Sequence, residues 1–167
     1  MSNRFDDLIG VLEKELEFHG LLIQAAFSMN AAIKIRSMDE VRKASRTYDE
    51  CTCRIQDLEE KRLQWSDEIC GYSGKTVGHA SLSRVMEHAP AECRQRLAAL
   101  RASLKEAVGN LSKINYSNQV LLCESLKTIA NLFKYIALHD PRNQGGYKKL
   151  GTMDRGRVAT AIVNTVA

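Results

Sequence analysis

The hydrophobic residues between Ala91 and Leu138 recur at steps of three and four or at sums of these steps, and they form the longest unbroken helical pattern in the chain. No proline interrupts this stretch. At a rise of about 1.5 Å per residue, the pattern predicts a helix on the order of 70 Å long. Such a helix is too long for a compact globule, so we expect it to lie along other long helices. Its apolar positions include Leu97, Leu100, Leu104, Val108, Leu111, Ile114, Leu122, Ile129, Leu132 and Ile136.

Two more long helices are predicted before this one. The first covers about residues 3–35, and the second covers 39–70, where apolar residues alternate steps of three and four. Ser37 is followed three residues later by Glu40, which is the spacing of a capping box, so we expect a tight hairpin between the two helices. Gly71 is placed to end the second helix.

Glycines and weaker periodicity after residue 70 predict a loop and one short helix near residues 80–89. After residue 138 the sequence becomes rich in glycine and basic residues, which is typical of a flexible arm. The arm ends in an apolar segment that is either a short helix or a strand. We therefore expect an all-α fold with two parts, an antiparallel bundle of three long helices and one short helix (residues 1–138, left-handed, up-and-down) and a C-terminal arm (139–167).

Three polar residues, Asn115, Asn118 and Ser125, lie within the broad apolar sector of the longest helix. A buried amide or hydroxyl without a hydrogen bond costs roughly 1–3 kcal/mol. These residues therefore either bond to one another or to a neighbouring helix, and so fix its register, or lie on a face that another protein completes.

Charge and composition exclude few functions, but they show which functions are favoured. The chain of 167 residues carries 24 basic and 20 acidic residues, a net charge of +4. This excess is weak and is not interleaved with aromatic residues, so nucleic-acid binding is disfavoured. The sequence shows no signal-peptide pattern and no apolar run of roughly 18 residues, so we expect a cytoplasmic protein without membrane insertion. The five cysteines are expected to be free thiols.

No group of residues in the sequence suggests catalysis or metal binding. Cys51 and Cys53 lie two apart on a predicted helix and point in nearly opposite directions, and the spacing of His79, His88 and Cys93 fits no zinc template. No serine, histidine and aspartate set falls on loops, where active-site groups usually lie. We expect neither an enzyme nor a cofactor.

Three blocks of the sequence, at residues 8–16, 37–41 and 114–129, resemble the FlgN family of flagellar export chaperones, and the resemblance covers about residues 5–138. The block with two asparagines is the most telling. The blocks read Leu8-Ile9-x-x-Leu12-Glu13-Lys14-Glu15-Leu16, Ser37-Met38-Asp39-Glu40-Val41 and Ile114-Asn115-x-x-Asn118-x-x-Leu121-Leu122-x-x-Ser125-Leu126-x-x-Ile129.

The resemblance implies a cytosolic chaperone of the flagellar type III export system. It would hold hook-filament junction (hook-associated) proteins unassembled by binding their C-terminal amphipathic segments, with export apparatus components as further candidate partners. Such a chaperone should be a monomer or weak dimer, whereas a structural coiled-coil adaptor would form a homo-oligomer through residues 39–70. We expect partner contacts in the second half of the longest helix and in the arm, at Asn115, Asn118, Leu122, Ser125, Leu126, Ile129, Phe133, Ile136, Val158, Ile162 and Val166.

Overall fold

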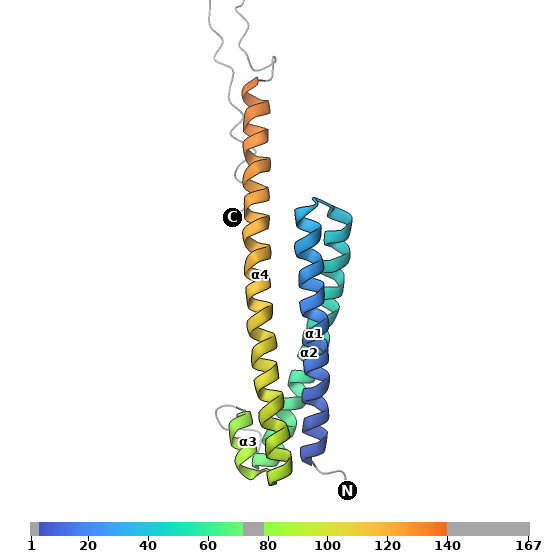
Figure 1. The fold of residues 1–167 in the computed structure, drawn as a ribbon, viewed down its shortest axis with the longest axis vertical. Coiled ribbons are helices and arrows are strands. Elements are labelled where there is room, and N and C mark those ends of the chain that lie inside the picture. The colour runs from blue at the N-terminus through green and yellow to red at the C-terminus, as the bar shows by residue number, and fades with distance from the viewer. Residues whose placement is uncertain (1–3, 72–78, 140–167) are drawn as a thin grey trace, which may run out of the picture. The chain divides into compact units, whose positions relative to one another are not determined.

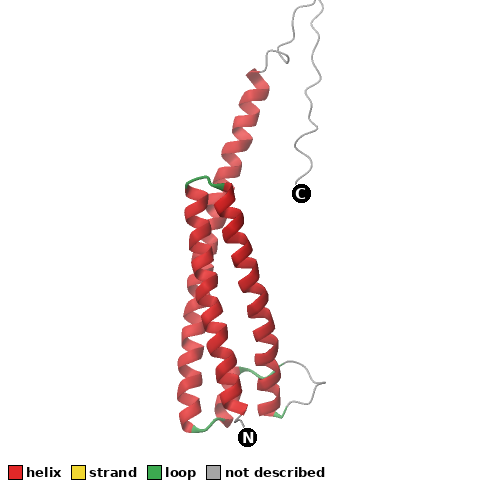
Figure 2. Ribbon diagram, turned by 90° about the vertical axis from the view of Figure 1, so that its right-hand side faces the viewer, coloured by secondary structure: helices red, strands yellow, loops and turns green. Residues whose placement is uncertain are grey.

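The computed structural model describes residues 4–71 and 79–139, and within them the regular structure is entirely α-helical (Figures 1 and 2). The predicted all-α bundle of three long helices and one short helix is confirmed. The observed helix bounds differ from the predicted ones by a few residues at most. The helices are α1 (Arg4–Lys34), α2 (Met38–Cys70), α3 (Leu82–His88) and α4 (Ala91–His139).

The turn between α1 and α2 forms a tight antiparallel hairpin. Arg36 has a left-handed backbone conformation, with φ of 57°, and its N–H donates to the Ile33 carbonyl. The Ser37 N–H donates to the Ala32 carbonyl, which completes a Schellman ending of α1. The predicted capping box is wrong, because the Ser37 side chain makes no capping bond. The Ser37 N–H that Glu40 would accept from is already committed to α1.

The C-terminal end of α2 is fixed by a glycine and an aspartate. Gly71 adopts φ of 68°, and its N–H donates to the carbonyl oxygens of Asp67 and Glu68, as predicted for a C-terminal glycine. The Asp67 carboxylate accepts hydrogen bonds of 2.7 Å from the Ala80 N–H and from the His79 ring. These bonds tie the start of the α3 segment to the last turn of α2.

The hydrophobic core lies where α3 and the first part of α4 meet the N-terminal part of α1. Leu8, Leu12, Val85 and Leu97 are fully buried there. Leu8 and Leu12 lie four residues apart on α1, and Leu97 lies three residues before the buried Leu100 on α4, so each of these two helices contributes one apolar stripe. Other buried members of this core are Ile9, Ala89 and Leu100.

The chain divides into two compact units, residues 1–122 and 123–167. In the first unit, α1, α2, α3 and the first part of α4 pack together. In the second unit, the described residues are the last part of α4, up to His139. The predicted domain boundary at residue 138 is not tested by this division and stays a prediction.

Candidate partner-binding surface

The last part of α4 exposes a run of large apolar side chains. Leu126, Ile129, Phe133 and Ile136 are 65%, 50%, 67% and 53% exposed. They follow one another at steps of three, four and three, which places them on one face of the helix. We call these four residues the α4 apolar surface. A contiguous exposed apolar face of this kind commonly marks a site of protein–protein interaction.

The residues that flank the α4 apolar surface are mostly small or uncharged, and the charged residues lie on the opposite face. Ala130 and Ala137 occupy flanking positions, so a partner helix can approach closely. On the opposite face, the Lys127 ammonium donates to the Glu124 carboxylate at 2.8 Å. This hydrogen bond raises the pKa of Lys127 above its ordinary value. The charged residues of this segment therefore lie away from the α4 apolar surface.

Two further predicted site residues lie close to this run in the sequence. Leu122, the last residue of the first unit, is 41% exposed and precedes Leu126 by four positions. Ser125 is also exposed. All of the predicted apolar contact residues in this half of α4 are thus accessible to a partner. Val158, Ile162 and Val166 lie outside the described residues.

Asn118, in contrast, is buried inside the first unit and links α4 to α1. Its side-chain Oδ1 accepts a hydrogen bond from the Asn30 Nδ2 at 2.8 Å, and its Nδ2 donates to the Ala26 carbonyl at 2.9 Å. Asn30 Nδ2 also lies within bonding distance, 3.2 Å, of the Ser117 hydroxyl. We call Asn30 and Asn118 the asparagine pair.

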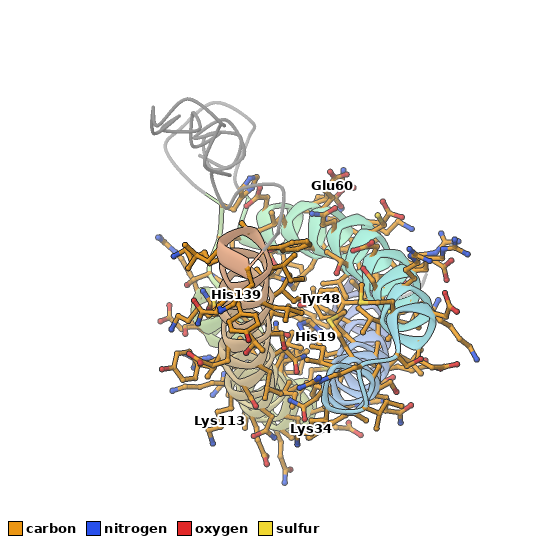
Figure 3. All side chains as sticks on the ribbon, turned by 90° about the horizontal axis from the view of Figure 1, so that it is seen from above. His19, Lys34, Tyr48, Glu60, Lys113 and His139 are labelled. Carbon is orange, nitrogen blue, oxygen red and sulfur yellow. The ribbon has the colours of Figure 1, made fainter. Side chains whose placement is uncertain are left out.

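Asn115 makes the corresponding link between α4 and α2. Its Nδ2 donates to the Tyr48 hydroxyl oxygen at 2.8 Å. Viewed from above, Tyr48 and His19 lie between the helices, whereas Glu60 points outward (Figure 3). Asn115 and Asn118 therefore make the bonds to neighbouring helices that the sequence allowed, and these bonds fix the register of α4 on the hairpin. A contact of either residue with a partner stays a prediction.

The sequence alone indicated that one of these partners, Asn30, needs a hydrogen bond. Asn30 falls on the apolar stripe of α1, where a polar residue needs a hydrogen bond, in the same way as Asn118 on α4. Their pairing was not predicted, because it depends on how the two helices are rotated and aligned. The Tyr48 hydroxyl gave no such signal, since a tyrosine on an apolar stripe packs its ring in any case.

The described residues show little sign of a reactive thiol or a metal site. The five cysteines are free thiols, and burial raises the pKa of Cys51 and Cys70 above the ordinary value, which disfavours the reactive thiolate. Across residues 4–71 and 79–139 no three histidine, cysteine or acidic side chains gather in a way that could hold a metal ion. None of the helices in this part of the chain is long and apolar enough to cross a membrane.

A helical bundle that fixes one long helix by side-chain hydrogen bonds and exposes an apolar face on that helix is suited to binding other proteins. The chain belongs to the FlgN protein family, whose family model matches residues 1–155. FlgN proteins are flagellar export chaperones, so the chain is a chaperone of flagellar assembly. No curated protein and no solved structure matches the chain.

Proposed function

We propose that this chaperone binds the C-terminal amphipathic segments of hook-filament junction proteins and keeps them unassembled in the cytoplasm until export, without catalytic activity of its own. The observation that carries the proposal is the α4 apolar surface. Cargo segments that polymerise through an apolar helix face need that face covered, and a helix laid against α4 would cover it. Contacts with export apparatus components belong to the same proposal.

The exposure of the α4 apolar surface sets a scale for cargo affinity. Full burial of one large apolar side chain is worth about 1.5–3 kcal/mol. Because these four side chains are already partly covered, each would contribute about 1–1.5 kcal/mol, and together about 5 kcal/mol before the cost of ordering the cargo is subtracted. Additional contacts are then needed for tight binding. A contribution of this size suits a complex that must release its cargo at the export gate.

The burial of α2 argues against a homo-oligomeric adaptor. The heptad of residues 39–70 would be the seam of such an adaptor. Its members Ala44, Cys51 and Leu58 are buried in the first unit, where α2 packs along α1. The seam is therefore occupied within one chain. This supports a monomer or weak dimer as the working form.

A matched pair of substitutions tests the proposal. Phe133 lies on the α4 apolar surface, whereas Leu138, which is 75% exposed, points about 160° away from the centre of that surface at 100° per residue. Isothermal titration calorimetry of the full chain with C-terminal segments of hook-filament junction proteins should show Phe133→Ala binding about tenfold or more weakly. Leu138→Ala should bind like the unsubstituted chain.

Equal losses for the two variants would show that the α4 apolar surface is not the cargo site. The absence of any binding to these segments by the unsubstituted chain would remove the cargo assignment itself. Because both side chains are exposed, far-ultraviolet circular dichroism should show the same helix content for all three proteins.

The arm at residues 139–167 is proposed to add contacts to the same cargo. The support is its sequence, because Val158, Ile162 and Val166 repeat at the spacing of one helix face. Deleting residues 139–167 should leave the helical circular-dichroism signal nearly unchanged and weaken cargo binding at least roughly tenfold, about 1.4 kcal/mol. Unchanged affinity would show that the arm does not contact cargo, and a collapse of helicity would show that it is a structural strap.

A further inference from the structure

The turn that joins α1 and α2 is the basic end of an otherwise acidic hairpin. Residues 34–46 contain five basic and two acidic residues, a net charge of +3, whereas residues 4–33 and 47–71 carry net charges of −3 and −4. Figure 1 shows this turn at one end of the hairpin. An anionic surface repels the body of such a hairpin and attracts its turn, so the charge distribution presents the turn to that surface.

Most of the basic side chains at this turn are not neutralised within the described part of the chain. The Arg42 guanidinium pairs with the Asp39 carboxylate at 3.2 Å. The other four basic side chains are exposed and form no hydrogen bond or ion pair with residues 4–71 or 79–139. They are Lys34, Arg36, Lys43 and Arg46. The dipole of α1 favours a cation such as Lys34 at its C-terminal end, but it gives no support to Lys43 and Arg46 on α2.

Arg36 occupies a backbone position that suits glycine better. Its φ of 57° is left-handed, and this conformation is more costly for a residue with a Cβ atom than for glycine. The turn itself uses the Arg36 N–H, which donates to the Ile33 carbonyl, and does not need an arginine side chain. Backbone strain of this kind is found where a side chain has a function. The strain therefore suggests a function for the exposed guanidinium.

Two large apolar side chains protrude beside these charges. Ile35 and Met38 flank the turn and are 71% and 62% exposed. On α2, Met38, Arg42 and Arg46 follow one another at steps of four and so lie on one face. Arg42 and Arg46 lie two residues to either side of the buried Ala44, about 160° from it around the helix, so this face points away from the packed side of α2. We use the name hairpin-turn surface for Ile35, Arg36, Met38, Arg42, Lys43 and Arg46.

The combination of protruding apolar side chains and unpaired cations indicates the kind of partner. A bilayer that contains anionic phospholipids offers negative headgroups to the basic side chains and an apolar layer beneath them to Ile35 and Met38. Clusters of four or more basic residues on an amphipathic segment are typical of binding to such lipids. A bilayer also adapts to a convex surface, whereas an acidic protein needs a cavity shaped for these two side chains.

We propose that the hairpin-turn surface binds peripherally to a bilayer that contains anionic phospholipids. The basic side chains pair with lipid phosphates, and Ile35 and Met38 enter the headgroup region. The contact lies on the membrane surface and requires no helix that spans it. The hairpin-turn surface shares no residue with the α4 apolar surface, so the proposal does not depend on the cargo assignment.

Vesicle sedimentation with the full chain tests this binding. The probes are large unilamellar vesicles of phosphatidylcholine alone and of an equal mixture of phosphatidylcholine and phosphatidylglycerol. The chain should bind the mixed vesicles at least tenfold more tightly. Raising the salt concentration to about 1 M, where the Debye length falls to about 3 Å, should remove most of this preference.

Three double variants with the same change in net charge locate the contact. Lys43→Glu with Arg46→Glu reverses two charges of the hairpin-turn surface and should weaken binding to mixed vesicles at least tenfold, since one basic residue near an anionic surface is worth about fivefold in affinity. The second variant changes exposed residues of α4 and the third changes the arm, and both should bind more tightly than the first. These two controls are Lys105→Glu with Lys113→Glu, and Lys148→Glu with Lys149→Glu.

Two single variants test the strained arginine and the apolar contact. Arg36→Gly should weaken binding to mixed vesicles about fivefold while it stabilises the fold, a combination that a purely structural role of Arg36 does not produce. Met38→Ser should weaken binding at least threefold. Val120→Ser makes the same kind of change at a 44% exposed position of α4 and should leave binding unchanged. Circular dichroism should show the same helix content for every variant.

Equal binding to the two kinds of vesicle, or binding to neither, would overturn the proposal. So would equal losses for the three double variants, or a larger loss for the arm variant than for Lys43→Glu with Arg46→Glu. If the latter variant does not fold, Arg36→Gly decides the question, and unchanged vesicle binding by Arg36→Gly would overturn the proposal. Binding of a glutamate-rich peptide without binding of vesicles would also overturn it, because the partner would then be an acidic protein segment.

Discussion

The asparagine pair should contribute measurably to the stability of the bundle. The substitution Asn118→Ala removes the hydrogen bonds of this pair. The substitution deletes the acceptor of the Asn30 Nδ2 bond at 2.8 Å and the donor to the Ala26 carbonyl at 2.9 Å. Asn118 is 4% exposed, so water does not replace the lost groups easily. The exposed neighbour Gln119, changed to alanine, provides the matched control on the same helix.

The expected loss follows from these contacts. Each hydrogen bond contributes a net of about 0.5–1.5 kcal/mol, so two contribute about 1–3 kcal/mol. The loss should stay near the middle of that range, because Asn30 keeps the Ser117 hydroxyl as a partner at 3.2 Å and Ala26 keeps its place in the α1 helix. We expect about 2 kcal/mol of unfolding free energy, which corresponds to a fall in Tm of about 4–8 °C for a chain of this size.

Urea unfolding followed by circular dichroism measures this loss, and a double-mutant cycle isolates the pair. Asn30→Ala and Asn118→Ala should each destabilise the protein, and the double variant should lose less than the sum, because both single changes break the same bond. Gln119→Ala should change stability by less than about 0.5 kcal/mol. Strict additivity of the two changes, or an Asn118→Ala effect no larger than the control, would refute a bonded pair.

Three other substitutions test the fold by urea unfolding. Arg36→Gly should stabilise the protein by about 0.5–1 kcal/mol, because glycine adopts the left-handed turn conformation without strain; a loss would contradict this. Hydrogen bonds from the Ala80 N–H and from His79 hold the pKa of Asp67 below its ordinary value of 3.8, so their contribution is complete above that value and is lost as pH falls through the lowered pKa. Asp67→Asn should therefore lose stability at pH 7 and less at pH 2, and an equal loss at both would contradict the linkage. Leu97→Ala should cost about 2–5 kcal/mol, since this core side chain is fully buried, and a loss under about 1 kcal/mol would place it outside the core.

The helices could be predicted from sequence because helix formation is encoded locally. Periodicity at 39–70 and Gly71 at its end fixed the bounds of α2 almost to the residue. The hairpin turn was harder, because two local signals compete for one N–H. Ser37 and Glu40 have capping-box spacing, yet the Ser37 N–H closes α1 instead. Local patterns do not indicate which of two such bonds is stronger.

The candidate surfaces required information that no local pattern carries. The asparagine pair depends on how α1 and α4 are rotated in the bundle. A hydrophobic stripe likewise shows that a face is apolar and not what covers it. Leu97 and Phe133 belong to the same helix, and the first is fully buried whereas the second is 67% exposed.

The length of α4 explains why some of its apolar residues do not pack against α1 or α2. α1 has 31 residues and α2 has 33, whereas α4 has 49. The 16 additional residues relative to α2 correspond to about 24 Å of helix at 1.5 Å per residue. Neither α1 nor α2 is long enough to pack along the whole of α4. The apolar residues in its last part are covered by another segment, of this chain or of another polypeptide, or they remain in water, which is unfavourable for a run of large side chains. The same sequence pattern that builds the core in the first part of α4 therefore supplies, in its last part, the exposed apolar surface that we propose as the cargo site.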